Sequence, residues 1–484
     1  MHTIQIDGPD PGNAHYHRPR DLRTSRRAAD SGMSSHIPEV EQAGMAEGNA
    51  GQKSLAITGR KAQLQDSSSL DRIEVALLTG GGDKPYAFGL ATQLISKGVT
   101  LDLIGSDDLD CPEFRGNPRV NFLNLRGDQR PDASFEGKFL RVLVYYFRLL
   151  RYALTAKPKI FHLLWNNKFE TFDRTLLMLY YRLLGKSIVL TVHNVNARIR
   201  DSSDTVFNRL TLRFQYHCAD HIFVHSEQMK TDLFVDFAVP SARVTVIPFG
   251  INNSIPDTHI TRTEARQRLG IPNEKRTILF FGNIAPYKGL EYLVAALRQL
   301  WSEQSDYRLI IAGRPKNCEK YWSELRQSIL EDVQKGRLLL KEEYIPDEDT
   351  EIYFKAADVL ALPYRYIYQS GVLFLGYSFG LPVLAADVGP LKEEIVEGET
   401  GFIFKPEDPA DTARAIESYF ASKLFANLAI QRRYIMDFAA ERHSWDIVGQ
   451  ATMSVYARLL RPGFSTGQSN RESQVTSPGA QDPS

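Results

Sequence analysis

The amino-acid sequence predicts an α/β fold with two doubly wound domains that face each other across a cleft. Short β-branched runs alternate with longer amphipathic segments, which is typical of βαβ units and parallel sheets. The chain has 484 residues, more than most single domains, and 43% of them are hydrophobic, which is ample for two packed cores. Ligands of open parallel sheets bind where the carboxyl ends of the strands face such a cleft.

The candidate strands fall into two sets. The first domain, 71–255, contains candidates at 72–79, 100–105, 159–164, 187–193, 221–226 and 244–248. The second domain, 256–440, contains candidates at 277–283, 307–313, 337–341, 357–363 and 382–387. A linker rich in Gly, Asn and Pro separates the sets, and a helix is expected to begin near Arg262. A last helix is expected within 441–462, and the polar tails 1–70 and 463–484 are expected to be disordered.

Composition excludes several functional classes. Lys and Arg together number 58 and so do Asp and Glu, so no net charge favours a nucleic-acid partner. Cys111, Cys218 and Cys318 lie far apart and form no CxxC pair, which argues against a disulfide framework or a zinc site. The N-terminal segment lacks the apolar stretch of a signal peptide. We therefore expect a cytoplasmic protein.

Three segments that follow predicted strands are candidate anion or substrate sites. A glycine loop that includes Gly81 and Gly82 follows the first strand and opens a helix, but it is not the GxGxxG pattern of dinucleotide binding. Lys288 stands between strand 277–283 and a helix, and Arg314 follows strand 307–313. Either cation could reach a phosphate near a helix N-terminus, although a lone cation in such a place is more often a solvated surface charge.

The segment from 368 to 404 is the most informative part of the sequence. Ser370, Gly371 and Val372 are expected to open a short buried helix, whose first backbone amides would point at a ligand such as a diphosphate. Gly380 and Pro382 then end the helix and begin a strand.

These motifs, in this order, resemble the nucleotide-binding half of retaining GT-B glycosyltransferases, in particular glycosyltransferase family 4. The likeness rests on GNIAPYKGLEYLVAAL, AADVLALPY followed by QSGV, GLPVLAADVGPLKE and GETGFIF. The first half matches more loosely, through the glycine loop, TVHN and DHIFVHSEQ. The resemblance covers roughly 73–460 and implies two Rossmann-like domains, with the acceptor on the first and the donor on the second.

The resemblance also implies roles for single residues. Lys288 would hold the donor diphosphate with Ser370 and Gly371, His193 would lie beside the transferred sugar, and Gly81 and Gly82 would approach the same region. The acceptor hydroxyl would attack from the front face, and the leaving phosphate would take its proton, so that charge stabilisation matters more than a protein base. Neither a metal nor another cofactor is expected. Without the resemblance, a histidine that ends a strand is more often a structural residue.

The chain departs from the family pattern at several places. The paired glutamates of the family are missing, because their places hold Ile367 and Leu375. The usual arginine after the first strand of the second domain is Asn283, which we keep as a donor-binding candidate, and Phe249 stands where HG is common. The expected partners are a nucleotide-sugar donor and a saccharide or lipid-linked acceptor. A nucleotide-sugar epimerase of the same fold and a non-catalytic binding subunit are the alternatives.

One further segment suggests contact with the inner face of a membrane. In 138–154, Lys138, Arg141, Arg148 and Arg151 fall toward one side of a helix, and Leu, Val, Tyr and Phe cover the rest. The alternative is a helix that packs in the core and exposes only one line of charged residues to the solvent.

Overall fold

The computed structural model describes residues 73–80, 84–127, 135–200, 203–251, 255–304 and 306–461. All of them belong to one compact unit, Lys61–Ser484. The tails expected at 1–70 and 463–484 lie outside the described residues, and so do Gly81 and Gly82.

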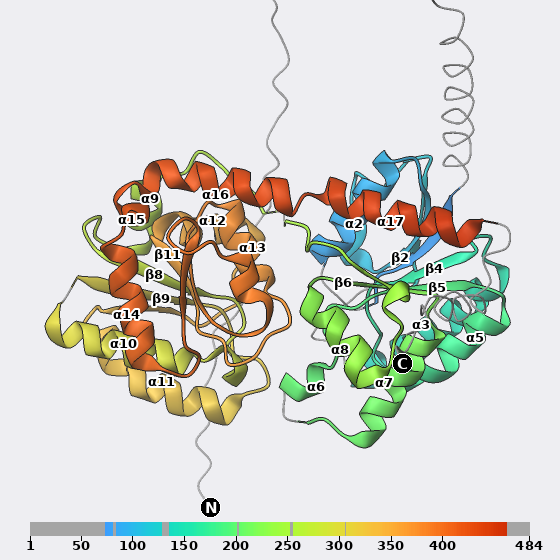
Figure 1. Cartoon of the computed structure of the whole chain (residues 1–484), viewed down its shortest axis with the longest axis horizontal. Helices are drawn as coiled ribbons and strands as arrows, with labels where there is room; N and C mark the ends of the chain where they lie inside the picture. The colour runs from blue at the N-terminus through green and yellow to red at the C-terminus, as the bar shows by residue number, and fades with distance from the viewer. Residues whose placement is uncertain are drawn as a thin grey trace, which may run out of the picture. The chain divides into compact units, whose positions relative to one another are not determined.

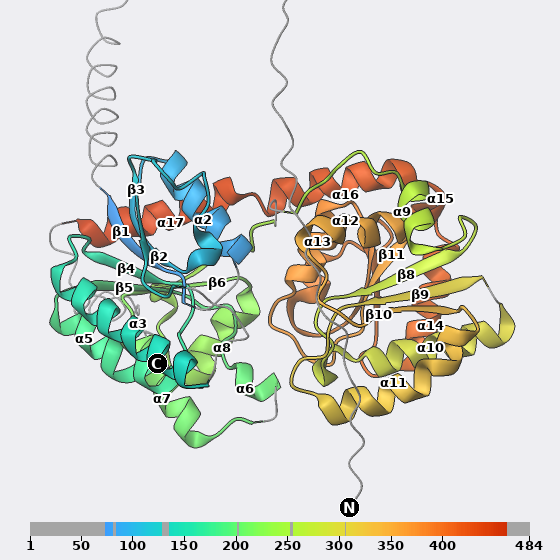
Figure 2. The ribbon, with the colours of Figure 1, turned by 180° about the vertical axis from the view of Figure 1, so that it is seen from behind.

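A seven-stranded parallel sheet forms the first domain, in the strand order β3-β2-β1-β4-β5-β6-β7. Its strands are β1 (Glu74–Leu78), β2 (Thr100–Gly105), β3 (Val120–Asn124), β4 (Ile160–Leu163), β5 (Ser187–Thr191), β6 (His221–Val224) and β7 (Val244–Val246). The helical segments of this domain are α2 (Lys84–Ser96), η1 (Asp107–Leu109), α3 (Phe135–Thr155), α4 (Glu170–Phe172), the π-helical turn η2 (Asp173–Leu177), α5 (Met178–Leu183), α6 (Ala197–Arg200), α7 (Val206–Cys218), α8 (Glu227–Phe237) and η3 (Ser241–Arg243). Helix α2 covers one face of the sheet, and α3, α5 and α7 cover the other (Figures 1 and 2).

A six-stranded parallel sheet forms the second domain, in the order β10-β9-β8-β11-β12-β13. Its strands are β8 (Arg276–Phe281), β9 (Tyr307–Ala312), β10 (Leu338–Lys341), β11 (Val359–Leu362), β12 (Val383–Ala386) and β13 (Gly401–Phe404). Its helical segments are α9 (Arg262–Leu269), η4 (Pro286–Lys288), α10 (Leu290–Glu303), α11 (Glu319–Gln334), α12 (Asp347–Ala356), α13 (Gly371–Ser378), η5 (Gly389–Glu394), α14 (Pro409–Phe420), α15 (Lys423–Ala426) and α16 (Leu428–Arg442). Helices α10, α11 and α14 lie on one face of this sheet, and α12, α13 and α16 lie on the other (Figure 1).

Every strand candidate from the sequence corresponds to a strand of the structure, and the fold class is confirmed. The helix expected near Arg262 begins there, because Thr261 and Glu264 form a capping box at its N-terminus. Two strands were not predicted, β3 and β13. Both are edge strands, where one side of the backbone has no partner strand and burial is less regular.

The last helix, α17 (Trp445–Leu460), packs against α2 of the first domain. Its Val448, Met453 and Tyr456 belong to the hydrophobic core that contains β1, β2 and α2. The ring of Trp445 is held between Gly89 and Gly250, where an added Cβ would come within 2.2 and 2.4 Å of it. Glycine at both places is therefore a packing requirement.

Helix α3 has an exposed face that carries apolar side chains. Between 136 and 155, the buried residues are Tyr145, Tyr146, Leu149 and Ala153, whereas Leu140 and Phe147 are 62% and 67% exposed. The alternative of a core helix that exposes only a line of charged residues is therefore wrong, since apolar side chains face the solvent. No helix in the described part of the chain is both long and apolar enough to cross a membrane.

Candidate functional site

Each sheet has one point where the strand order reverses, and the candidate residues gather at these two points. In the first sheet the reversal lies between β1 and β4, and in the second between β8 and β11. Loops diverge there at the carboxyl ends of the strands, which leaves room for a ligand. Gly80 and Trp165 follow β1 and β4, and Lys288 and Ser370 follow β8 and β11.

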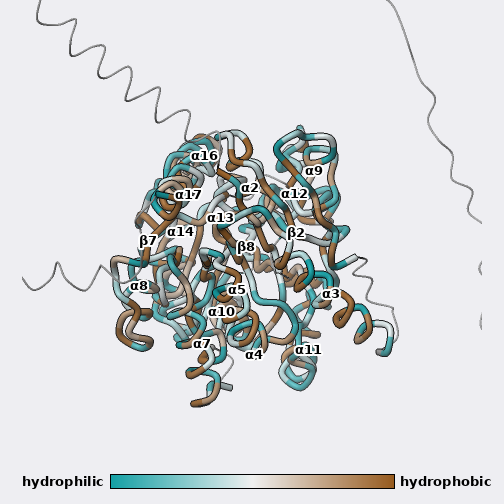
Figure 3. Tube along the Cα trace, turned by 90° about the vertical axis from the view of Figure 1, so that its right-hand side faces the viewer, coloured by the Kyte–Doolittle hydropathy of each residue, from teal (hydrophilic) through white to brown (hydrophobic). Residues whose placement is uncertain are grey.

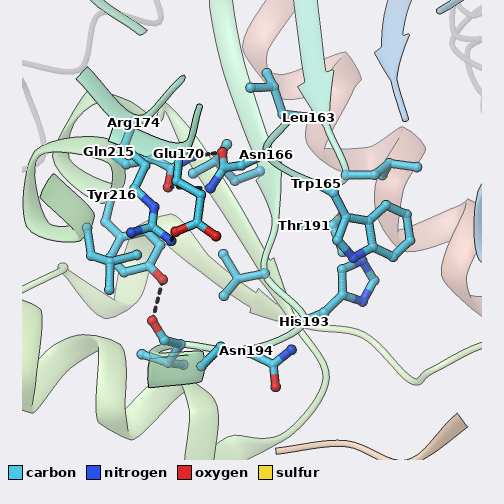
Figure 4. Close-up of a pocket in the computed structure, with 16 residues that line it drawn as sticks. Leu163, Trp165, Asn166, Glu170, Arg174, Thr191, His193, Asn194, Gln215 and Tyr216 are labelled. Carbon is cyan, nitrogen blue, oxygen red and sulfur yellow. Dashed lines mark hydrogen bonds and ion pairs between the residues drawn. The ribbon is translucent and has the colours of Figure 1, made fainter. Parts of the chain in front are cut away.

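His193 lies after β5 in an aromatic cluster. Its ring stacks on Trp165, with centroids 4.1 Å apart and planes 3° from parallel, as Figure 4 shows. Tyr86 of α2 meets the same imidazole edge-on at 4.7 Å. Gly80, with φ +58°, lets the backbone pass Trp165 so closely that a Cβ would lie 2.3 Å from the Trp165 carbonyl oxygen. Gly80 and His193 are therefore packed around one tryptophan.

His225 holds His193 in one tautomer. His225 Nδ1 lies 3.3 Å from the Ile247 carbonyl oxygen, which can only accept, so this nitrogen carries the proton and Nε2 is left as an acceptor. That Nε2 lies 3.1 Å from His193 Nδ1, which must then donate. Nε2 of His193 is buried without a hydrogen-bond partner in the described residues, and carries a lone pair. Burial, with His225 and His162 nearby, lowers the pKa of His193 well below its usual value and keeps the ring neutral.

A pocket of about 200 Å³ adjoins His193 and Trp165 at the ends of β4 and β5. The amides of Asn166 and Gln215 bond to each other across it, at 2.6 and 3.3 Å. Glu170 and Arg174 form an ion pair of 2.9 Å on its wall (Figure 4), and Nε of Arg174 is buried without a partner in the described residues. The pocket thus offers amides and charges of both signs, which suits a hydroxylated ligand.

Lys288 is only 6% exposed although it lies on the surface turn η4. Its Nζ lies over the rings of Phe280 and Tyr364, at 5.8 and 5.6 Å from their centroids. A Cβ on Gly282 would come within 3.2 Å of this Nζ and 3.4 Å of a methyl group of Val372. Lys288 therefore points back to the end of β8 and meets the first turn of α13 there.

The first turn of α13 presents backbone amides beside Lys288. Ser370 caps the helix by accepting from the Leu373 amide at 3.3 Å, and its own side chain lies 3.2 Å from the Tyr364 hydroxyl. The amides of Gly371 and Val372 come before this capped position and have no intrahelical partner. Gly371 itself is exposed to the solvent. The helix start expected from the sequence is confirmed.

Phe249 connects the two groups of residues. Its ring lies 6.2 Å from His193 and stacks at 5.4 Å on Phe374 of α13. A Cβ on Gly371 would lie 4.0 Å from the same ring. The histidine cluster and the first turn of α13 are therefore separated by a single aromatic side chain.

Asn283 and Arg314 are the two remaining donor-binding candidates in the second domain. Asn283 is exposed and lines a cavity of about 610 Å³ together with Ile199, Lys316, Arg365 and Glu407. The guanidinium of Arg314 lies over the ring of Tyr344, 5.5 Å from its centroid. The donor-binding roles of these two residues stay predictions, as do those of Gly81 and Gly82.

The two halves of the chain each match a family of known proteins. Residues 80–254 match the model described as Glycosyltransferase Family 4. Residues 261–435 match the model described as Glycosyl transferases group 1. The chain belongs to the glycosyltransferases.

Solved structures show the fold of this glycosyltransferase. Sucrose-phosphate synthase from Thermosynechococcus elongatus superimposes with a TM-score of 0.64 and 19% identity, over 80% of this chain and 99% of that one. HepE from Anabaena, in complex with UDP and glucose, gives a TM-score of 0.62 and 16% identity over 80% and 100%. The catalytic domain of starch synthase IV from Arabidopsis thaliana, bound to ADP and acarbose, gives a TM-score of 0.60 and 14% identity, over 80% of this chain and 99% of that one. The fold is of the GT-B type.

Curated relatives are glycosyltransferases as well. D-inositol 3-phosphate glycosyltransferase of Streptomyces avermitilis is 28% identical over 50% of this chain and 53% of its own length. An uncharacterized glycosyltransferase of Methanocaldococcus jannaschii is 27% identical over 78% of this chain and 94% of its own. The chain spans about half the length of the first of these relatives.

Ile367 and Leu375, the residues predicted at the places of the paired glutamates, are apolar. Ile367 and Leu375 are both 7% exposed and pack in the core of the second domain. Among the described residues, no group of three or more His, Cys, Asp or Glu side chains is arranged to hold a metal ion.

Sequence reasoning missed Trp165 and His225. Trp165 directly follows the predicted strand 159–164, and His225 lies at the end of the predicted strand 221–226, which is where ligand-binding residues gather in such sheets. Their place at the end of a predicted strand was the signal in the sequence that could have identified them. Their contacts with His193 are formed between strands far apart in sequence, and no local pattern shows them.

Proposed function

We propose that this glycosyltransferase moves a hexose-type sugar from a nucleotide-sugar donor to a saccharide or lipid-linked acceptor, with retention at the anomeric carbon, in the synthesis of a surface polysaccharide or glycolipid. One observation carries the proposal. The amides at the start of α13 and Lys288 meet at one strand-order reversal, and Phe249 joins them to the His193 cluster at the other. An anion and a sugar can therefore be held side by side.

The donor class follows from the chemistry of the second domain. Lys288 supplies a buried positive charge, and the free amides of Gly371 and Val372 add the partial positive charge of a helix N-terminus. Such a site suits a diphosphate. The fold neighbours in complex with UDP and glucose, and with ADP, support the same ligand class.

His193 is assigned to the donor sugar. A neutral imidazole with an unpartnered, buried Nε2 lone pair accepts a hydrogen bond from a sugar hydroxyl, which a protonated ring could not do. The stacked Trp165 offers an apolar wall, and the polar pocket beside it suits the hydroxyl groups of the acceptor.

The proposed chemistry is a front-face displacement. The bond between the anomeric carbon and the diphosphate oxygen breaks, the acceptor oxygen forms the new bond on the same face, and the acceptor proton passes to the departing phosphate. Lys288 and the α13 amides stabilise the charge that develops on the diphosphate, so that no metal or protein base is required. The proposed location is the cytoplasm, because all three cysteines are unpaired.

A thermal-shift screen tests the donor site. The wild type is heated with UDP, GDP, ADP and dTDP and with their common sugar conjugates, and a ligand that binds only the folded state must raise the melting temperature. One nucleotide is expected to stabilise the wild type. Lys288→Met should abolish this shift, because it keeps the aliphatic stem and removes the charge. His193→Ala should retain the nucleotide shift.

The matched control is Lys320→Met, which removes an exposed cation from α11 of the same domain and should leave the shift unchanged. Transfer and donor hydrolysis are then assayed with the nucleotide that binds. If no nucleotide stabilises the wild type, the non-catalytic alternative replaces this proposal. If the product is an isomerised nucleotide sugar, the epimerase does.

A further inference from the structure

Three helical segments of the first domain expose many large apolar side chains to the solvent. They are α3, the stretch from 169 to 183 that contains α4, η2 and α5, and α7. Most of the large exposed hydrophobic side chains in the described residues lie here, and Figure 3 shows brown, hydrophobic stretches along α3. The apolar side chains are Phe139, Leu140, Leu143, Val144, Phe147 and Leu154 on α3, Phe169, Leu176, Leu179 and Leu183 on the middle stretch, and Val206, Phe207, Leu210 and Phe214 on α7. We call this surface the three-helix face.

The three segments are neighbours in space. The Tyr180 hydroxyl of α5 donates to the Leu150 carbonyl of α3 at 3.0 Å, and α5 also packs against α7. Both views of the ribbon show α3, α5 and α7 together on one side of the first sheet (Figures 1 and 2). Soluble proteins rarely expose large contiguous apolar patches, and such patches mark binding to a protein or a membrane.

The charge of this face decides between a membrane and a second copy of the chain. The three segments contain three acidic residues, Glu136, Glu170 and Asp173, against eight basic ones. Arg174, Arg182 and Arg209 form ion pairs with carboxylates. The other basic residues are Lys138, Arg141, Arg148, Arg151 and Arg213. Arg148, Arg151 and Arg213 are exposed and form no ion pair within the described residues. A symmetric dimer would bring this positive surface against itself, which is unfavourable, whereas an anionic surface complements it.

The geometry points to the three-helix face as a docking surface for an anionic lipid bilayer. The apolar side chains would enter the boundary between headgroups and acyl chains, and the arginines would reach lipid phosphates. The long aliphatic stems of arginine let their charged ends stay at this level while neighbouring side chains go deeper. The protein would lie on the membrane rather than cross it.

This docking would also orient the candidate site. Leu212, Gln215 and Tyr216 line the pocket beside His193 with the buried side of α7, while the opposite side of the helix belongs to the three-helix face. A lipid-linked acceptor held in the bilayer would then have its headgroup next to that pocket. This second step rests on the proposed function, whereas the docking itself does not.

Vesicle flotation of the full-length chain tests the docking. The wild type is mixed with vesicles of phosphatidylcholine and phosphatidylglycerol, or of phosphatidylcholine alone, and it should float with the first and remain at the bottom with the second. The variant L140S/F147S/L210S should lose most of the flotation, and so should R148E/R151E. Added salt should weaken the binding of the wild type.

Matched controls carry the same kinds of change elsewhere. Ile430→Ser replaces a side chain that is 73% exposed on α16, and Lys320→Glu reverses an exposed charge on α11. Both should float like the wild type. Nucleotide-induced thermal shifts of all variants should equal that of the wild type, which separates this test from that of the donor site.

Two outcomes would overturn the docking. In the first, the wild type fails to float with anionic vesicles, or floats equally well after the changes on the three-helix face. In the second, the wild type is dimeric by sedimentation and becomes monomeric in L140S/F147S/L210S without any vesicle binding, which would make the face an interface between copies.

Discussion

His193 has its protonation fixed by a second histidine and a backbone carbonyl. We predict that in the wild type His193 carries its proton on Nδ1, because His225 accepts there. A long-range ¹⁵N–¹H correlation spectrum of histidine-labelled protein should show this form, with Nε2 unprotonated. In His225→Phe the ring packing is retained and the acceptor is lost, so His193 should shift toward the form protonated on Nε2. The exposed His217→Asn is the control, and a wild type already protonated on Nε2 would contradict the assignment.

The sequence predicted part of the candidate site at this scale. The candidates Lys288, Ser370 and Gly371 were selected because each lies between a strand and the start of a helix, which is a local signal. The ring contacts of Trp165 and the bond between His225 and His193 join separate strands of the sheet, and only the folded chain brings them together. Arg314 was placed correctly after its strand, but the direction of a long side chain is set by neighbours such as Tyr344.

At the scale of the element, the cap of α13 has both a structural and a ligand-facing role. Ser370→Ala removes the acceptor for the Leu373 amide, and the free energy of unfolding should fall by about 1 kcal/mol. Ser422→Ala, which removes an equivalent cap from α15, should have a similar effect. Denaturant unfolding measures both. Only Ser370→Ala should also weaken the binding of the nucleotide that stabilises the wild type, and equal binding by both variants would argue against a diphosphate at α13.

The contact between α2 and α17 gives a second test of an element. Gly89→Ala would push a methyl group into the ring of Trp445 and should cost about 1–3 kcal/mol of unfolding free energy, as overpacking does. Gly449→Ala lies on the same contact, but its methyl group would meet the flexible side chain of Gln93. The methyl group would lie 2.5 Å from Gln93 Cγ, so this variant should also lose stability, but less than Gly89→Ala, because an aliphatic side chain turns away more easily than an indole ring and alanine favours helices. Equal losses of stability in both variants would show that the tryptophan is not the rigid partner.

The strands of both sheets were largely predictable, because buried parallel strands are continuous apolar runs. The strand β3, with the sequence VNFLN, is partly exposed along most of its length and carries two asparagines, which weakens that signal. The strand β13 has only four residues and was recognised as a motif rather than as a strand. Edge positions therefore account for what the pattern missed.

On the scale of the whole molecule, buried neutral histidines predict a loss of stability in acid. Burial lowers the pKa of His162 and His221 to about 3 and that of His225 to about 4. These histidines are neutral in the folded chain but take up protons below about pH 6.5 once it unfolds. Their contribution to stability is thus present above about pH 6.5 and is lost as the pH falls toward the pKa values that the histidines have in the folded chain.

Asp173 acts in the opposite direction, because burial raises the pKa of its carboxyl to about 6. The stability that Asp173 contributes grows as the pH falls from about 6 toward the pKa that its carboxyl has in the unfolded chain. It is, however, a single group that opposes three histidines. We therefore expect the free energy of unfolding to fall by about 2 kcal/mol or more between about pH 7 and about pH 5. Denaturant unfolding across this range measures it, and a flat or rising profile would contradict the expectation.

The position of α17 has a consequence for how the protein is made. The first sheet is synthesised early, but its core includes Val448, Met453 and Tyr456 from the last helix, and the Tyr456 hydroxyl lies 2.5 Å from the buried His162 of β4. During translation, the apolar surface that α17 covers in the first domain stays exposed until the whole second domain has left the ribosome. A chaperone that binds nascent chains would find its target there, and release would coincide with the arrival of α17.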